Sequence, residues 1–268
     1  MDKISIITTF YNAQTFIGNA IASVLGQKVP DGCEIEYVLV DDKSQDNSRN
    51  IVENIINNTS KENFKFKLVE PENNLGCGGA RKFGIENATG NYFMFLDADD
   101  YYIHLDFVEN AYNTITSENA DVVEYGVIYN QQNGQQSNST APQKIVLTDP
   151  HDMEIALFKD NLIKFNVWSK MYTRKIVESY PYSTVRTFED VRTIPVWISN
   201  CNKVVIMPIP QINYRAASNS IIRTNWVDTR LGTISAIAEL FPRFKDDRQL
   251  LKAMYTRSMI DLEAILNN

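Results

Sequence analysis

The chain has 268 residues, enough for one large domain with a sizeable core and too few for two full enzymes. Its 33 Asp and Glu outnumber its 26 Lys and Arg, and the net charge of −7 with no cluster of basic residues argues against a nucleic-acid-binding protein. Cys33, Cys77 and Cys201 are widely spaced without a CxxC pattern, as expected of reduced core thiols in a cytoplasmic protein.

The sequence predicts neither a signal peptide nor a transmembrane segment. Met1 to Lys3 lead directly into a strand pattern instead of a charged and then apolar leader. Every apolar stretch is far shorter than the roughly 20 residues that span a bilayer. Any membrane contact is therefore expected to be peripheral.

The first half of the chain alternates strand and helix patterns. Strands are predicted at 4–10, 34–40, 64–69 and 92–96, and helices at 14–26, 45–57 and 79–88. This alternation favours an α/β fold with a Rossmann-like, mainly parallel sheet that helices cover on both faces.

The rhythm changes near residue 120, after a predicted helix at 104–117. Residues 121–129 and 144–147 are predicted to form a hairpin excursion around a loop at Asn133 and Gly134. Further patterns predict helices at 152–159 and 190–199, a strand at 203–208, and two amphipathic helices from residue 228 to the end. We expect a domain over 1–222, with a nucleotide-binding half to about 120 and an acceptor half beyond it, and a C-terminal helical extension over 223–268.

Acidic residues follow two predicted strands. Asp41 and Asp42 end the second strand, and the run from Asp97 to Asp100 follows the fourth. Ligands of open parallel sheets bind beyond the carboxyl ends of the strands. Carboxylates gathered there repel one another unless a cation or hydrogen-bond donors compensate, so a metal or a ribose is a natural partner. The alternative is that the run simply caps the following helix.

A glycine-rich turn precedes the third predicted helix. Gly76, Gly78 and Gly79 would let the backbone approach a ligand at the helix N-terminus. The turn has neither the GxGxxG spacing of a dinucleotide site nor the Lys-Ser/Thr of a P-loop. A plain tight turn explains it about as well.

Several segments, in order, resemble glycosyltransferase family 2, the inverting enzymes of the GT-A fold. In the first half these are residues 5–12, with Thr9 where the family usually has Pro, and residues 40–46, 74–84 and 96–100. In the second half they are residues 168–172, residues 188–191, and Tyr214-Arg215 with Ser218 and Ser220. The resemblance covers about residues 3–221 and does not extend to the last helices.

The resemblance implies a role for each matched residue on the donor side. The implied donor-binding residues are Thr9, Tyr11, Asp41, Asp42, Gly76, Arg81, Asp97, Ala98 and Arg215. Tyr11 would pack on the base, Asp41 or Asp42 would accept a hydrogen bond from a uracil-like N–H, and Asp97 would contact the ribose.

Asp99 is the implied metal ligand, and its oxygen chemistry suits Mg²⁺ or Mn²⁺. The third ligand of some relatives is a His in a C-terminal loop. Here the histidines are His104 and His151, which we expect on the surface and outside that loop.

On the acceptor side, the resemblance implies Asp190 as general base beside Glu189, with Trp168 and Lys170 near the acceptor. An acceptor hydroxyl must lose its proton as it attacks the anomeric carbon, and one displacement inverts that centre. The alternatives are that the two acids are ordinary N-terminal helix charges and that Trp168 belongs to the core.

The sequence thus predicts a metal-dependent inverting glycosyltransferase that moves a sugar from a nucleotide-diphosphate donor, UDP in our interpretation, to a hydroxyl acceptor in surface glycan or polysaccharide synthesis. Three alternatives stay open: glycosylation of a modified DNA base, a sugar nucleotidyltransferase, and a non-catalytic nucleotide-sugar-binding protein. The absence of a glycine-rich, Arg- and Lys-containing signature beside the first strand argues against the second. The intact Asp97, Asp99 and Asp190 argue against the third.

Overall fold

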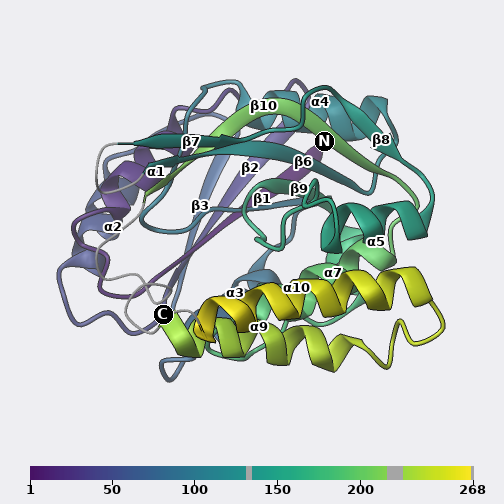
Figure 1. Ribbon diagram of the computed structural model, residues 1–268. Coiled ribbons are helices and arrows are strands. Elements are labelled where there is room, and N and C mark those ends of the chain that lie inside the picture. The colour runs from purple at the N-terminus through teal and green to yellow at the C-terminus, as the bar shows by residue number, and fades with distance from the viewer. Residues whose placement is uncertain (131–134, 216–225, 267–268) are drawn as a thin grey trace.

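The structure is a computed structural model that describes residues 1–130, 135–215 and 226–266 (Figure 1). Its strands are β1 Asp2–Phe10, β2 Cys33–Asp41, β3 Phe64–Val69, β4 Tyr92–Phe95, β5 Tyr101–Tyr102, β6 Val122–Asn130, β7 Gln136–Ser139, β8 Ile145–Leu147, β9 Lys170–Thr173 and β10 Val204–Arg215. Its helices are α1 Ile17–Leu25, α2 Ser48–Asn57, α3 Gly76–Asn87, α4 Phe107–Ser117, α5 Pro150–Phe158, α6 Arg174–Ser179, α7 Glu189–Ser199, α9 Trp226–Leu240 and α10 Arg248–Leu266.

Within the described residues the strands form one ten-stranded sheet: eight follow the order β3-β2-β1-β4-β9-β6-β10-β5, and off this path β7 pairs with β6 and β8 with β10. The first four of these strands are all parallel, with Ile7 of β1 opposite Val38 of β2 on one side and Phe95 of β4 on the other. All nine residues of β2 are buried, as a central parallel strand covered on both faces requires. The predicted α/β fold is confirmed.

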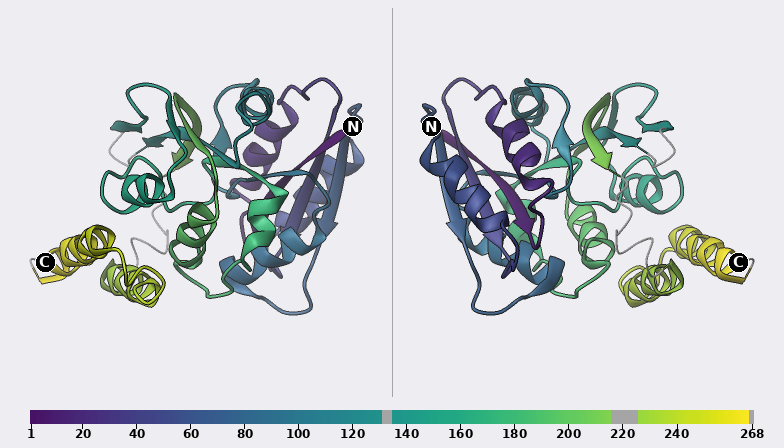
Figure 2. Two further views of the ribbon diagram at one scale, coloured as in Figure 1. Left: turned by 90° about the vertical axis from the view of Figure 1, so that its right-hand side faces the viewer. Right: turned by 90° about the vertical axis from the view of Figure 1, so that its left-hand side faces the viewer.

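Helices cover both faces of this parallel part (Figure 2). On one face, α3 packs against β1 and β2, and the absent side chain of Gly84 allows the approach, because a Cβ there would lie 2.7 Å from Ile7 Cγ2. On the other face, α1 packs beside α2, and the ring of Phe107 from α4 meets that of Tyr125 at 4.9 Å.

The second half of the sheet is mixed. Strand β9 is antiparallel to both β4 and β6, and β10 is parallel to β6. A hairpin forms in the predicted region, but the prediction of its second strand is wrong. The strand that pairs with β6 is β7, whereas residues 145–147 pair antiparallel with β10. The predicted turn residues Asn133 and Gly134 lie outside the described residues.

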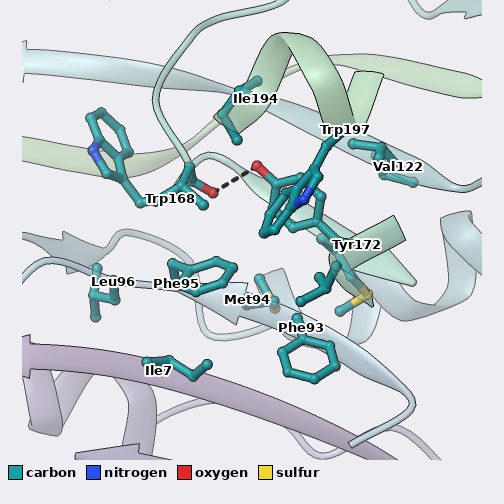
Figure 3. Close-up of a cluster of buried hydrophobic side chains, with 14 of the residues drawn as sticks. Ile7, Phe93, Met94, Phe95, Leu96, Val122, Trp168, Tyr172, Ile194 and Trp197 are labelled. Carbon is teal, nitrogen blue, oxygen red and sulfur yellow. Dashed lines mark hydrogen bonds between the residues drawn. The ribbon is translucent and has the colours of Figure 1, made fainter. Parts of the chain in front are cut away.

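Aromatic side chains join the sheet to α7 in the core (Figure 3). Tyr172 of β9 meets Trp197 of α7 with ring centroids 5.3 Å apart, and Phe95 meets Tyr172 at 6.0 Å. The Tyr172 hydroxyl donates to the carbonyl oxygen of Val167 at 3.0 Å, so this buried polar atom is satisfied. These contacts fix α7 and the segment before β9 against the end of β4.

The helices α9 and α10 pack together beside the sheet domain (Figure 2). Helix α9 contacts α7, and α10 contacts α5. Arg192 of α7 donates twice to Glu239 of α9, both times at 2.9 Å. Nowhere in the described ranges is a helix both long and apolar enough to cross a bilayer.

Candidate functional site

The candidate site lies at the edge where β1, β2 and β4 end. Thr9 is the penultimate residue of β1, and Tyr11, just beyond that strand, is 51% exposed. Asp41 is the last residue of β2, and Asp97 follows β4 after one residue. Because the three strands are adjacent and parallel, the structure brings these predicted residues to one edge.

The acidic run after β4 divides into residues with different surroundings. Asp97, Ala98 and Asp99 are partly exposed, whereas Asp100 is only 1% exposed. The Asp100 carboxylate accepts a hydrogen bond from the Arg215 backbone N–H at 2.8 Å. Asp100 therefore fastens the end of β10 to the site and leaves Asp97 and Asp99 facing the edge.

Asp99 has the character of a metal ligand. It forms no ion pair among the described residues. Burial, and then the neighbouring charge of Asp97, raise its pKa to about 6. A divalent cation would offset the neighbouring charge of Asp97, and the carboxylate oxygens of Asp97 and Asp99 suit a hard cation. The residues present therefore fit the metal that the sequence motif implies.

Asp42 holds the glycine-rich turn in place. One of its carboxylate oxygens accepts from the Leu75 N–H at 2.7 Å and the other from the Gly76 N–H at 2.8 Å. Gly76 has a φ of 73°, which favours glycine, and burial raises the pKa of Asp42. The neighbouring Asp41 accepts from the Ser44 N–H at 2.8 Å. Both acids thus organise loops at the edge, a role that sequence spacing did not show.

Arg81 of α3 joins the two halves of the site. Its guanidinium is buried and donates to Asp97 Oδ1 at 2.6 Å and also to Glu189 Oε1. The prediction placed Arg81 among the donor-binding residues, and the structure places it between the acidic run of β4 and the start of α7. The partners are 16 and 108 residues away in sequence, so no local pattern could have revealed this bridge.

Helix α7 begins at Glu189 and carries the predicted base in its first turn. Glu189 is buried against Arg81, whereas Asp190 is partly exposed and accepts from the Val191 N–H at 2.8 Å. Burial, and then the charge of Glu189, raise the pKa of Asp190 to about 7. A carboxylate with that pKa can exchange a proton near neutral pH.

The residue before α7 has an unusual conformation. Phe188 has a φ of 61°, in the left-handed region. Its ring lies against α9, where a Cβ at Gly232 would come within 2.2 Å of the ring. The packing of Phe188 on this glycine thus holds the entry to α7 in place.

The two residues predicted near the acceptor have different environments. Trp168 is 7% exposed and stacks on Tyr214, with ring centroids 5.6 Å apart and planes at 12°. Lys170 is fully buried, donates to the Asn166 carbonyl at 2.6 Å and lies 3.6 Å from Glu124. Burial lowers the pKa of Lys170 and raises that of Glu124, and their ion pair opposes both shifts. Lys170 thus lies in the core between Asn166 and Glu124, and its assignment to the acceptor side stays a prediction.

Arg215, the last predicted donor-binding residue, ends β10. Its guanidinium lies 4.8 Å from the ring centroid of Phe16. Ser218 and Ser220, which were matched to the family together with Tyr214-Arg215, lie outside the described residues.

Another group of ligand-type side chains lies away from this edge. His151 and Glu154 of α5 and Asp247, before α10, have side-chain atoms within 4.8 Å of one another. His151 Nδ1 and Asp247 Oδ2 are 2.5 Å apart. Both histidines were expected on the surface: His104 is exposed, and His151 is partly exposed in this contact between α5 and the C-terminal helices.

Comparisons with known proteins give a consistent result. The profile of Glycosyl transferase family 2 matches residues 5–180. EpsH of Bacillus subtilis, named as a glycosyltransferase, is 29% identical over 180 residues, which are 67% of this chain and 49% of EpsH. The chain thus spans about half the length of this relative.

Solved structures show the same fold. The S. aureus TarS fragment 1–349 in complex with UDP has a TM-score of 0.67 at 20% identity, covering 88% of this chain and 65% of that one. The mannosyltransferase PcManGT of Pyrobaculum calidifontis, in complex with GDP-Man and Mn²⁺, has a TM-score of 0.65 at 17% identity, covering 99% and 75%.

Proposed function

Because this chain belongs to glycosyltransferase family 2 and has the GT-A fold of that family, we propose that it moves a sugar from UDP, with inversion, to a hydroxyl of a glycan acceptor. One observation carries the proposal. Arg81 contacts both Asp97 at the donor edge and Glu189 beside the candidate base, so the two halves of the reaction meet at one buried cation.

The donor half of the proposal rests on the ends of β1, β2 and β4. Tyr11 offers an exposed ring for a base, and Asp41 and Asp42 lie beside it at the end of β2. TarS binds UDP on a similar fold, which supports a uridine nucleotide here. Asp97 would then face the ribose and Asp99 would hold Mg²⁺ or Mn²⁺.

The metal, when bound, would stabilise negative charge on the leaving diphosphate. Asp99 is suited to hold it because the carboxylate is partly buried beside Asp97 without a cationic partner of its own among the described residues. Arg81 keeps Asp97 in a fixed position next to it. The mannosyltransferase with Mn²⁺ supports such a site on this fold.

The acceptor half rests on Asp190. In the proposed step the acceptor oxygen bonds to the anomeric carbon, the bond from that carbon to the phosphate oxygen breaks, and the hydroxyl proton passes to Asp190. We assign the stacked rings of Trp168 and Tyr214 to the acceptor side, because aromatic faces commonly pack against sugar rings. On the strength of the family, we place this reaction in surface glycan or polysaccharide synthesis.

The decisive test is turnover of a panel of nucleotide sugars with and without Mn²⁺, followed by chromatography of the released nucleotide. We expect the native chain to release UDP from one UDP-sugar. This release should stop in excess chelator and in the variant Asp99→Asn. The matched control is Asp106→Asn, which changes an acid before α4 that forms no side-chain cap. Full turnover in chelator, or full activity of Asp99→Asn, would overturn the metal assignment, and preference for another nucleotide would overturn the assignment of UDP.

A further inference from the structure

Helix α10 exposes large apolar side chains on two sides. Tyr255 and Leu266, 59% and 75% exposed, lie on one side. Ile260, 55% exposed, lies roughly 120–140° around the helix from both, because successive helical residues are about 100° apart. The helix has 19 residues and so is about 28 Å long.

A hollow of about 330 Å³ opens beside Ile260, between α10 and the end of α5. Its apolar lining comes from Phe158, Ala253 and Ile260, and its cations are Lys159, Lys252 and Arg257. No Asp or Glu lines it. The hollow therefore suits a ligand with an anionic group and an apolar part.

The two lysines are available for such a ligand. Lys159 and Lys252 are exposed and form no ion pair among the described residues. Arg257 lies 4.0 Å from Asp261 and 5.8 Å from the ring centroid of Phe165, so its charge is partly engaged. The chain as a whole has a net charge of −7, so an anionic surface would repel most of the protein surface. Such a surface would therefore bind preferentially at the cations of the hollow.

We propose that the hollow and the adjoining Ile260 of α10 bind an anionic phospholipid membrane. The lipid phosphate lies between Lys159 and Lys252, and the apolar lining receives the start of an acyl chain. Ile260 enters the interfacial region beside it, as aliphatic residues do in helices that lie on a bilayer. Lysine stems run along apolar surface while their ammonium groups reach the lipid headgroups.

The test is sedimentation of the full chain with vesicles of phosphatidylglycerol or of phosphatidylcholine. We expect binding to the anionic vesicles only, weakened by salt because the attraction is partly electrostatic. Lys252→Glu should lower the partition coefficient about tenfold or more. The matched control, Lys28→Glu, makes the same charge change in the exposed loop after α1 and should bind as the native chain does.

The apolar contribution has its own pair of variants. Ile260→Ser should weaken vesicle binding, whereas Ile209→Ser, at a residue of β10 that is 40% exposed, should not. Equal binding to both vesicle types, unchanged binding of Lys252→Glu, or binding of inorganic phosphate without vesicles would overturn the proposal. So would self-association in place of vesicle binding. Release of UDP from a soluble donor without vesicles should be unaffected in Lys252→Glu, so a failure here is distinct from a failure of the proposed enzyme activity.

Discussion

At the scale of single residues, the candidate site is a set of carboxylates whose environments differ. Asp97 and Glu189 share Arg81, whereas Asp99 and Asp190 do not contact it through a hydrogen bond. The pKa values of Asp99 and Asp190 are raised to about 6 and about 7. Environment thus separates carboxylates that position the site from those suited to hold a metal or take a proton.

The first prediction concerns Asp190. If its carboxylate takes the acceptor proton only as the new bond forms, Asp190→Asn should lower kcat by roughly 10²–10⁴-fold with little change in donor affinity. In the native chain kcat/KM should rise with pH until the group with a pKa of about 7 is deprotonated, because a base acts in its deprotonated form. Initial rates across pH and calorimetry with UDP measure both effects.

The comparison variant for this prediction is Asp42→Asn, which removes charge at the donor edge and should weaken donor binding first. If Asp190→Asn transferred sugar at the native rate, or lost donor affinity as its main defect, the base would have to be another residue.

The second prediction concerns Glu154. Burial, and then the charge of Asp247, raise its pKa to about 7, while His151 and Arg243 oppose the shift and Asp149 adds to it. A raised pKa contributes stability that is complete below the unfolded value of about 4.3 and is lost as pH rises through 7. Glu154→Gln should therefore stabilise the chain at pH 8 by about 1 kcal/mol, a figure reduced for solvent screening, and change little at pH 4.

Urea unfolding at the two pH values measures the Glu154 effect. The control Glu178→Gln removes an exposed i,i+4 partner of Arg174 and should show no such gain at pH 8. Destabilisation of Glu154→Gln at pH 8 would mean that the carboxylate has a favourable partner there.

At the scale of elements, local sequence patterns predicted where most of the longer strands and helices lie. The predicted strand at 64–69 matches β3 at both ends, and the helix at 190–199 begins one residue late. The missed strands β5, β7 and β9 have two to four residues each and the missed helix α6 has six, too few for a period to show. The mispaired hairpin has a related cause: residues 145–147 pair with a strand nearly 60 residues later, and loop lengths alone do not reveal such pairing.

The third prediction compares two helical glycines. At Gly78 of α3 a Cβ would lie 2.4 Å from the Val185 carbonyl oxygen and 2.5 Å from that of Ser183, and backbone cannot easily move away. Gly78→Ala should cost about 1–3 kcal/mol of unfolding free energy. At Gly18 of α1 nothing lies within 4 Å, so Gly18→Ala should gain up to about 1 kcal/mol.

Chemical denaturation of the two alanine variants measures this difference. Equal effects of the two substitutions would show that the loop at 183–185 does not pack on α3 as described.

At the scale of the whole molecule, the sequence predicted which residues share the sheet edge and not how the site is joined across the chain. Strand-end carboxylates follow from the order of strands and helices, because parallel strands end together. The bridge of Arg81 to Glu189, the burial of Lys170 with Glu124, and the stacking of Trp168 on Tyr214 join residues that are distant in sequence. Only the assembled tertiary structure determines such pairs.

The fourth prediction treats ligand binding as a property of the whole fold. A ligand that binds only the folded state, present at 100 times its Kd, stabilises by about 2.7 kcal/mol. UDP with Mn²⁺ should therefore raise Tm by roughly 5–10 °C in a chain of this size. Asp99→Asn should keep the shift due to UDP alone and lose the additional shift due to the metal.

Differential scanning calorimetry with ADP in place of UDP is the control for this prediction, and a smaller shift is expected with ADP. Equal shifts for the two nucleotides would contradict base recognition at the ends of β1 and β2.

The contact of Phe188 with Gly232 has a consequence for how this chain can evolve. Phe188 holds a backbone conformation that costs a phenylalanine about 1–2 kcal/mol, and its ring fits only because position 232 has no side chain. The two positions should therefore covary among related chains: where a bulkier residue replaces the glycine, a smaller residue or a glycine should replace the phenylalanine. An alignment of related chains in which positions 188 and 232 vary independently would contradict this expectation. It would show that substitutions in the C-terminal helices do not constrain those at the start of α7.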